Sequence, residues 1–289
     1  MISDILLKPL RKLLSPALVE SLKINWKNFR DTPPIVIYQM GKVGSTTVCE
    51  SLKNADLPNP VYHVHFLSHD GIKNAEEYFL GLQKGISPPH IKRSKMLRKK
   101  IDKKKGVQWK IITLVREPIG REISDFFQVV DRYYPDLIDE NGDVNKSSAI
   151  EFLQERLANY DESTNYTSTW FDKELKQAFN IDVYAYPFNH EDSFTIIRKE
   201  NINVLILRLE DLHSSFNNAL SQFLDLEAPV RMVTSNVGRD KSYSEAYRYV
   251  LKNIAVPESV CAKIYSSKYT KHFYDENSIN EFIHKWSKV

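Results

Sequence analysis

The chain has 289 residues, of which 42% are hydrophobic and 27% charged, a composition that supports a large buried core and excludes an intrinsically disordered protein. Its formal net charge of +3 is small for this length, so the overall charge excludes a typical nucleic-acid-binding protein. The two cysteines, Cys49 and Cys261, lack the spacing of a disulfide framework or a zinc ribbon. We therefore expect one main domain in a reducing, cytoplasmic compartment.

The N-terminal segment differs from the rest of the chain in its pattern. Residues 1–32 mix Leu, Ile, Lys and Arg at roughly helical spacing, and Pro33 and Pro34 then stop a helix. Charged residues interrupt the apolar patch Ile5-Leu6-Leu7, which argues against a signal peptide, and no apolar run approaches the ~20 residues of a spanning helix. We expect a basic amphipathic arm (1–32) before one α/β domain (33–289). Residues 1–30 pack on this domain or, alternatively, make a peripheral contact with the inner membrane surface.

Short β-branched apolar runs alternate with longer stretches of helical periodicity. The predicted strands are Ile35–Tyr38, Val61–Phe66, Trp109–Val115, Ile181–Tyr186 and Val204–Leu209. Strands that are apolar on both faces and alternate with helices are typical of a parallel α/β sheet. Such a sheet binds its ligands at the carboxyl ends of the strands.

A glycine-containing loop follows the first predicted strand and enters a helical pattern. The loop consists of Gly41, Lys42, Val43, Gly44, Ser45, Thr46 and Thr47. Glycines allow a close backbone approach, the first helical N–H groups are unpaired, and the hydroxyls can donate to a phosphate. The lysine precedes the second glycine, whereas a Walker A loop places it after that glycine. The alternative interpretation is a glycine turn capped by serine and threonine.

A second loop follows the third predicted strand. Arg116 ends the strand, Pro118 is placed to begin a helix, and Ser124 falls two turns further along it. The arginine and the serine could bind one phosphate monoester together. Alternatively, Arg116 is an ordinary residue at a strand end and Ser124 an ordinary helix position. An arginine here, in place of a metal-binding aspartate, argues against a nucleoside triphosphatase.

Two histidines mark the end of the second predicted strand. Alternation places His63 and His65 on the same side of that strand. A His-x-His pair can bind a metal, but the sequence has no matching Asp, Glu or Cys cluster, so we predict no metal site. The remaining interpretations are structural histidines or a base for an acceptor hydroxyl.

Together, the two loops resemble the PAPS-dependent sulfotransferase family, where PAPS is 3′-phosphoadenosine 5′-phosphosulfate. Lys42–Thr46 is similar to the family's 5′-phosphosulfate loop, and Arg116 with Ser124 to its 3′-phosphate site. Val204–Leu212 resembles its late strand and Glu-Asp-Leu turn. More narrowly, Gln39–Ser45 and Leu114–Pro118 resemble the bacterial group labelled putative capsular polysaccharide synthesis proteins. The resemblance runs from about residue 34 to about residue 249, and the Pro-Lys-Ser/Thr-Gly-Thr motif of the cytosolic sulfotransferases is missing.

The resemblance implies a P-loop-type three-layer sandwich with a central, mainly parallel sheet, and transfer of a sulfuryl group from PAPS to a carbohydrate hydroxyl without a metal. It implies that Lys42 is catalytic and that His65, with His63 as the alternate, is the base. The residues implied in PAPS binding are Gly41, Lys42, Val43, Gly44, Ser45, Thr46, Thr47, Arg116 and Ser124, with Gly238, Arg239 and Lys241 in a later loop that covers the 3′-phosphate. The partner would be a glycan acceptor, such as a capsular or other cell-surface polysaccharide.

Two other functions remain open from the residues alone. One is a P-loop kinase-like phosphoryl transferase, which the position of Lys42 and the lack of a magnesium aspartate disfavour. The other is a non-catalytic phosphonucleotide-binding protein, which the lysine and histidine together disfavour. A basic run between Lys92 and Lys105 is expected to be a solvated helix or a contact for an anionic glycan. An aromatic cluster from Trp170 to Phe188 is expected in the core or against sugar rings.

Overall fold

The computed structural model describes residues 24, 28–82, 88–103, 106–233 and 243–288. Most of the predicted N-terminal arm lies outside the described residues, as does the whole loop that contains Gly238, Arg239 and Lys241. Two described residues of the arm, Ile24 and Phe29, are buried. The Phe29 ring packs on Tyr62 and Trp109, so this part of the arm contributes to the core of the domain.

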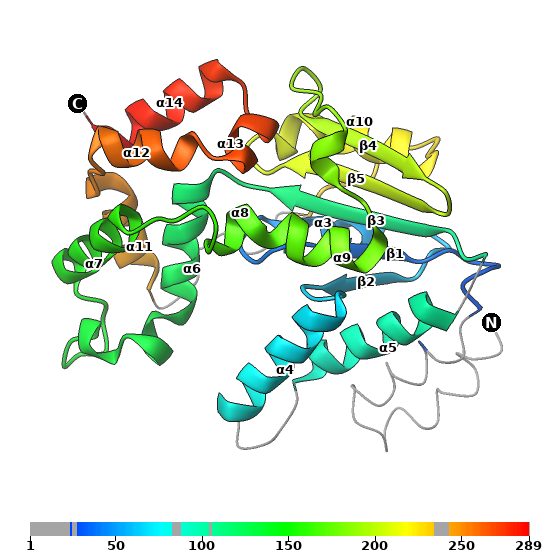
Figure 1. Cartoon of the computed structure of the whole chain (residues 1–289), viewed down its shortest axis with the longest axis horizontal. Coiled ribbons are helices and arrows are strands. Elements are labelled where there is room, and N and C mark those ends of the chain that lie inside the picture. The colour runs from blue at the N-terminus through cyan, green and yellow to red at the C-terminus, as the bar shows by residue number, and fades with distance from the viewer. Residues whose placement is uncertain (1–23, 25–27, 83–87, 104–105, 234–242, 289) are drawn as a thin grey trace.

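A mainly parallel β-sheet forms the centre of the described chain (Figure 1). Its five strands, in spatial order, are β2 (Val61–Val64), β1 (Ile35–Tyr38), β3 (Trp109–Val115), β5 (Ile202–Arg208) and β4 (Phe194–Lys199). The first four are parallel, and β4 pairs antiparallel with β5. The connection from β2 to β3 crosses β1, so the strand order reverses between β1 and β3. In open α/β sheets, such a switch point opens a crevice at the carboxyl ends of the strands.

Helices connect and flank the strands. They are α3 (Ser45–Asn54), α4 (His69–Leu82), α5 (Pro89–Lys103), α6 (Pro118–Tyr133), α7 (Lys146–Ala158), α8 (Tyr166–Trp170), α9 (Gln177–Phe179), α10 (Leu212–Leu224), α11 (Ser244–Asn253), α12 (Glu258–Tyr265), α13 (Lys268–Phe273) and α14 (Glu276–Ser287). The described residues also form two 3₁₀ turns, η2 (Pro135–Leu137) and η4 (Val183–Ala185), and a π-helical stretch, η3 (Phe171–Lys176). Among the described helices, none is long and apolar enough to cross a membrane.

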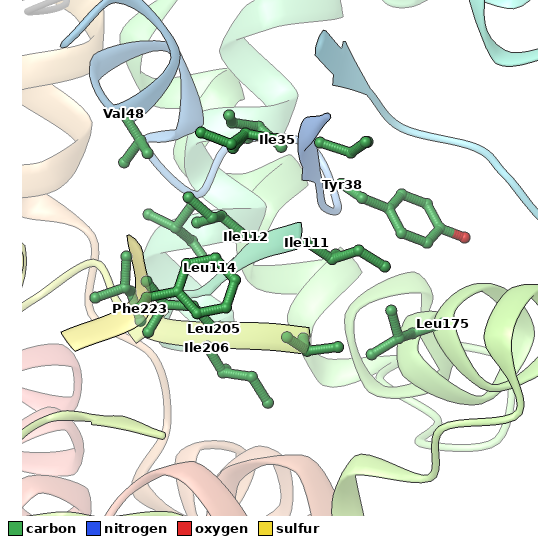
Figure 2. Packing of buried hydrophobic residues seen from close by; sticks show 14 of the residues in the cluster. Ile35, Tyr38, Val48, Ile111, Ile112, Leu114, Leu175, Leu205, Ile206 and Phe223 are labelled. Carbon is green, nitrogen blue, oxygen red and sulfur yellow. The ribbon is translucent and has the colours of Figure 1, made fainter. Parts of the chain in front are cut away.

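Both faces of the sheet are covered because its central strands are apolar on both sides. Figure 2 shows Tyr38 and Ile111 pointing toward Leu175 of η3, while Val48 of α3 and Phe223 of α10 lie on the opposite side. All five side chains are buried, in one hydrophobic cluster. The predicted mixed α/β class with a mainly parallel sheet flanked by helices is therefore confirmed.

A second hydrophobic cluster lies beside the sheet, between α6, α7, α11, α12 and α14 (Figure 1). Helix α6 supplies several of its buried side chains, including Ile119, Ile123 and Phe126. This cluster packs α6, which begins shortly after β3, against the neighbouring helices. It thereby positions the second loop that the sequence singled out.

The sequence-based strand assignment was wrong at one place and incomplete at another. Residues 181–186 form no strand, because Asn180 adopts a left-handed conformation (φ 55°) and the Asp182 side chain caps η4 through the Tyr184 N–H at 3.1 Å. The missed strand β4 forms a hairpin with β5, and Glu200 in the intervening turn has a positive φ of 53°. β2 also ends at Val64, two residues before the predicted boundary.

Candidate functional site

A cavity of about 1140 Å³ lies at the carboxyl ends of β1, β2 and β3. It brings together the loop after β1, the histidines after and within β2, and Arg116 and Ser124 around the start of α6. Of the predicted loop residues, Gly41, Lys42, Gly44, Ser45, Thr46 and Thr47 line it, together with His63 and His65. Val43 is fully buried and anchors the loop in the core instead.

The loop after β1 turns twice through the left-handed region. Gly44 has φ 79° and is the N-cap of α3, and because glycine has no side chain, it provides no side-chain cap for the first N–H groups. Lys42 has φ 71°, a conformation that costs a non-glycine residue of order 1–3 kcal/mol. A lysine in such a backbone conformation, on the wall of a cavity, points to a role for its side chain.

Gly44 also approaches its neighbours closely. A Cβ atom at this position would lie 2.4 Å from Cδ1 of Leu209, whereas a Cβ at Gly41 would meet nothing within 4 Å. We predict that Gly44→Ala lowers the free energy of unfolding by about 1–3 kcal/mol, through its positive φ and this contact. Gly41→Ala is the control in the same loop and should change stability little. Urea unfolding of both variants checks this, and equal losses would contradict the assignment of strain to Gly44.

Two arginines hold the carbonyl groups of this loop. Nη1 of Arg116 donates to the Lys42 carbonyl at 3.0 Å, and Nε of Arg121 donates to the Gly41 carbonyl at 3.2 Å. Each guanidinium has further N–H groups beyond this one bond. Both arginines therefore fix the loop backbone. Arg116 also adds positive charge to its surroundings, which favours an anion there, whereas the charge of Arg121 is paired with Glu122 and Asp125.

The second loop is held by residues from far along the chain. The Tyr269 hydroxyl accepts from the Arg116 N–H at 3.1 Å and donates to the Arg116 carbonyl at 3.0 Å. Glu210 accepts from the Glu117 N–H at 2.9 Å and from the Tyr274 hydroxyl at 2.9 Å. The Glu-Asp-Leu turn thus has a structural role, since it positions the start of α6.

The start of α6 at Pro118 follows the sequence prediction, whereas its cap was not predicted. Pro118 is its first residue, and the Glu117 carboxylate accepts from the Gly120 N–H at 2.8 Å. The buried Tyr265 hydroxyl donates to the other carboxylate oxygen of Glu117 at 2.7 Å. With the helix start fixed, Ser124 comes two turns later and lines the same cavity as Arg116, as the spacing predicted.

The two histidines lie side by side, although only His63 belongs to β2 and His65 directly follows the strand. Their ring centroids are 5.2 Å apart. Nε2 of His63 is 3.0 Å from Oγ of Ser45, at the N-terminus of α3. Nδ1 of His65 is 3.1 Å from the backbone carbonyl of Gln39. His63 therefore contacts the glycine loop directly, whereas His65 is bonded to the end of β1.

Both imidazoles are neutral at pH 7. Burial, acting together with the nearby His65, Arg93 and Lys53, lowers the pKa of His63 to about 3. Burial also lowers the pKa of His65, with Arg93 adding to the effect and the hydrogen bond to Gln39 opposing it. The pKa of the neighbouring His90 is lowered by burial and by His65 and Arg93. A neutral imidazole has a lone pair, so either ring can accept a proton.

Another part of the cavity wall was missed by the sequence analysis. Arg121 is 2% exposed; its Nη1 donates to Glu122 at 3.0 Å, and its Nη2 lies 3.4 Å from Asp125. Arg156 of α7 pairs with the same two carboxylates, and the Arg121 guanidinium lies 5.1 Å from the centre of the Tyr166 ring. No local sequence pattern predicts this network, because its members come from α6, α7 and the start of α8.

Other sequence candidates lie elsewhere. Within the described part of the basic run, no lysine or arginine lines the cavity, and Arg98 is buried, donating to the Ala178 carbonyl at 2.9 Å and to Asp102. Trp170, Phe171 and Phe188 are buried in the core. In the described ranges, no group of three or more His, Cys, Asp or Glu side chains could hold a metal ion.

Comparison with known proteins gives one match. The family model described as "Putative capsular polysaccharide synthesis protein" matches residues 139–275. No curated protein and no solved structure matches the chain. The matched segment begins after the two loops that follow β1 and β3 and extends past residue 249, so it does not coincide with the resemblance seen in the sequence. It supplies Arg156, Tyr166 and Leu209 to the cavity and Glu210 and Tyr269 to the support of the second loop. Over this segment, the chain is similar to a family described by capsular polysaccharide synthesis.

Proposed function

We propose that this chain is a sulfotransferase that moves a sulfuryl group from PAPS to a hydroxyl of a carbohydrate. The observation that carries the proposal is that two anion-suited loops and a pair of neutral histidines meet in one cavity at the sheet's switch point. A donor with two separate phosphate groups needs two such loops, and an acceptor hydroxyl needs a base.

The residues of the cavity fit the donor. Its volume exceeds the ~300–1,000 Å³ usual for small-molecule sites, which leaves room for a nucleotide and part of an acceptor. Helix α3 begins at Ser45, has Gly44 as its N-cap and continues with Thr46 and Thr47, so its N-terminus would face the 5′-phosphosulfate. Arg116 and Ser124 would bind the 3′-phosphate. Gly238, Arg239 and Lys241 remain proposed contacts outside the described residues.

The transfer itself requires little covalent chemistry from the protein. PAPS supplies an activated sulfuryl group: the acceptor oxygen forms a bond to sulfur while the bond from sulfur to the phosphate oxygen breaks. Lys42 stabilises the negative charge that develops on that leaving oxygen. His65 takes the proton of the acceptor hydroxyl, so adenosine 3′,5′-bisphosphate and a sulfated acceptor are the products.

The proposed acceptor class rests on the family match and on the polar and aromatic cavity wall. Tyr166, Tyr243 and Tyr247 line the cavity together with Asn159 and Thr164. Aromatic rings can pack on the apolar faces of sugars, and hydroxyl and amide groups can bind sugar hydroxyls. A carbohydrate from a capsular or other cell-surface polysaccharide fits this wall.

Two experiments test the proposal. Calorimetry should show binding of PAPS and adenosine 3′,5′-bisphosphate and weak binding of ATP with magnesium. Radiolabelled sulfate should then pass from PAPS to at least one member of a panel of bacterial glycans. Preference for ATP with magnesium would support a phosphoryl transferase, and nucleotide binding without transfer to any glycan would support a non-catalytic binding protein.

The second loop provides a separate prediction about the 3′-phosphate. Arg116→Ala should weaken binding of adenosine 3′,5′-bisphosphate by ~1.5–3 kcal/mol, the scale of a charged hydrogen bond, and should affect AMP much less. Because Arg116 also holds the Lys42 carbonyl, Ser124→Ala is the companion variant that leaves this bond in place. Both variants should lose preference for the bisphosphate over AMP in calorimetry. If both variants kept the wild-type preference for the bisphosphate, this loop would not be the 3′-phosphate site.

A further inference from the structure

Gln39, the residue after β1, lies between the two histidines and is 1% exposed. Its side-chain amide is 3.1 Å from Nε2 of His63 and 3.2 Å from Nδ1 of His65. Its backbone carbonyl is 3.1 Å from the same Nδ1 of His65. One buried residue thus contacts both rings, and it contacts a different nitrogen on each.

The donors and acceptors in this group can be assigned in order. A backbone carbonyl only accepts, so Nδ1 of neutral His65 must carry the ring proton, and Nε2 keeps the lone pair. The amide group that faces this N–H must then also accept, because two N–H groups cannot bond to each other. Among the described residues, Oε1 of Gln39 has no partner when the amide nitrogen faces the rings. Turning the amide by 180° gives the oxygen two partners, and amide orientation is assigned from such bonding.

The same oxygen determines the state of His63. If Oε1 of Gln39 accepts from Nε2 of His63, that nitrogen carries the ring proton. It then also faces Oγ of Ser45 at 3.0 Å as a donor. His63 would present an N–H toward the start of α3, whereas His65 would keep Nε2 as a basic nitrogen.

We propose that Gln39 is a positioning residue that fixes opposite tautomers in the two histidines, with the proton on Nδ1 in His65 and on Nε2 in His63. The catalytic consequence rests on the proposed function: His65 is the ring that can accept the acceptor's proton, and His63 donates toward the loop that would hold the phosphosulfate. The tautomers themselves do not depend on that function.

Long-range ¹H–¹⁵N NMR of the ligand-free full chain, labelled at histidine, tests the assignment without any activity. Spectra of His63→Ala and His65→Ala identify the two rings among the eight histidines. The wild type at pH 7.5 should show the proton on Nε2 of His63 and on Nδ1 of His65. A proton on Nδ1 of His63 would overturn the proposal, whatever the enzyme does.

Three variants separate positioning from packing. Gln39→Met keeps the length but removes the acceptor, so His63 should shift toward its other tautomer while His65, held by the backbone, stays unchanged. Gln39→Glu keeps an acceptor and should preserve both tautomers. Gln177→Met makes the same change at an exposed position of α9 and should leave both rings as in the wild type. An unchanged His63 in Gln39→Met would show that another group sets its tautomer.

Kinetics add a second readout. Gln39→Met should lower kcat about 10-fold, the lower end of what loss of an orienting partner produces, with the KM for PAPS nearly unchanged. A rise in KM alone would contradict a positioning role. If the wild type transfers no sulfate, the proposed function fails, and the NMR result still decides the tautomers.

Discussion

Replacing Lys42 with alanine should lower sulfate turnover by a factor of about 100 or more, because a charge that acts mainly in the transition state is lost. Affinity for adenosine 3′,5′-bisphosphate should fall much less, since the N-terminus of α3 and Arg116 remain. Single-turnover transfer from radiolabelled PAPS measures the first effect, and calorimetry the second. Equal losses in both would make Lys42 a phosphate ligand without a specific catalytic role.

The backbone of Lys42 provides a matched control. Its φ of 71° suits glycine, so Lys42→Gly removes the same charge but relieves the strained conformation. Both variants should lose turnover to a similar extent, whereas only Lys42→Gly should gain stability, by up to about 1 kcal/mol in urea unfolding. Retained turnover in Lys42→Gly would mean that the alanine variant fails through its backbone and that the lysine charge is dispensable.

The positions of the strands and of the cavity residues could be predicted from the sequence where local patterns determine them. Apolar runs identified β1, β3 and most of β5, and proline after a strand placed the start of α6 at Pro118. Once those elements are parallel neighbours, their carboxyl ends must meet, so the glycine loop, Arg116 and Ser124 come together. Alternation alone put His63 and His65 on one side.

The errors in the predicted strands also have local causes. Residues 181–186 are apolar and aromatic enough for a strand, but Asp182 caps a 3₁₀ turn and its side-chain bond outweighs that propensity. Residues 194–199 were missed although Thr195, Ile196 and Ile197 are β-branched. Only two residues separate β4 from β5, so this segment was not recognised as a strand of its own. Reading these as one hairpin would have found the antiparallel edge strand.

The support of the site could not be read from the sequence at all. Arg121 reaches a carbonyl 80 residues earlier, and the Tyr269 hydroxyl bonds to the Arg116 backbone 153 residues away. Gln39 stands next to the glycine loop, but its contacts to both histidines exist only once β1 and β2 pair. Such contacts depend on tertiary packing, for which the sequence carries no spacing rule.

Replacing His65 with alanine should slow transfer by about 10²–10⁴-fold while PAPS binds normally, because only the acceptor of the proton is lost. The base works in its neutral form, so the wild-type rate should fall as the pH drops through the pKa of His65. Burial lowers this pKa, with Arg93 reinforcing the shift, so the midpoint should lie below the ordinary value of 6.5. This acidic limb should disappear from the pH–rate profile of His65→Ala.

The control is His213→Ala, at an exposed position of α10, which should keep both the rate and the acidic limb. His63→Ala distinguishes the two rings, since both are neutral at pH 7 and both line the cavity. Near-normal transfer by His65→Ala alongside an inactive but folded His63→Ala would move the base to His63, the ring next to Ser45.

Activity in both variants would leave a carboxylate as the base, and Glu122, Asp125 and Asp161 line the same cavity. Of these, Glu122 and Asp125 already pair with Arg121 and Arg156. The strongest result for His65 is therefore a slow variant whose residual rate no longer depends on pH below 7.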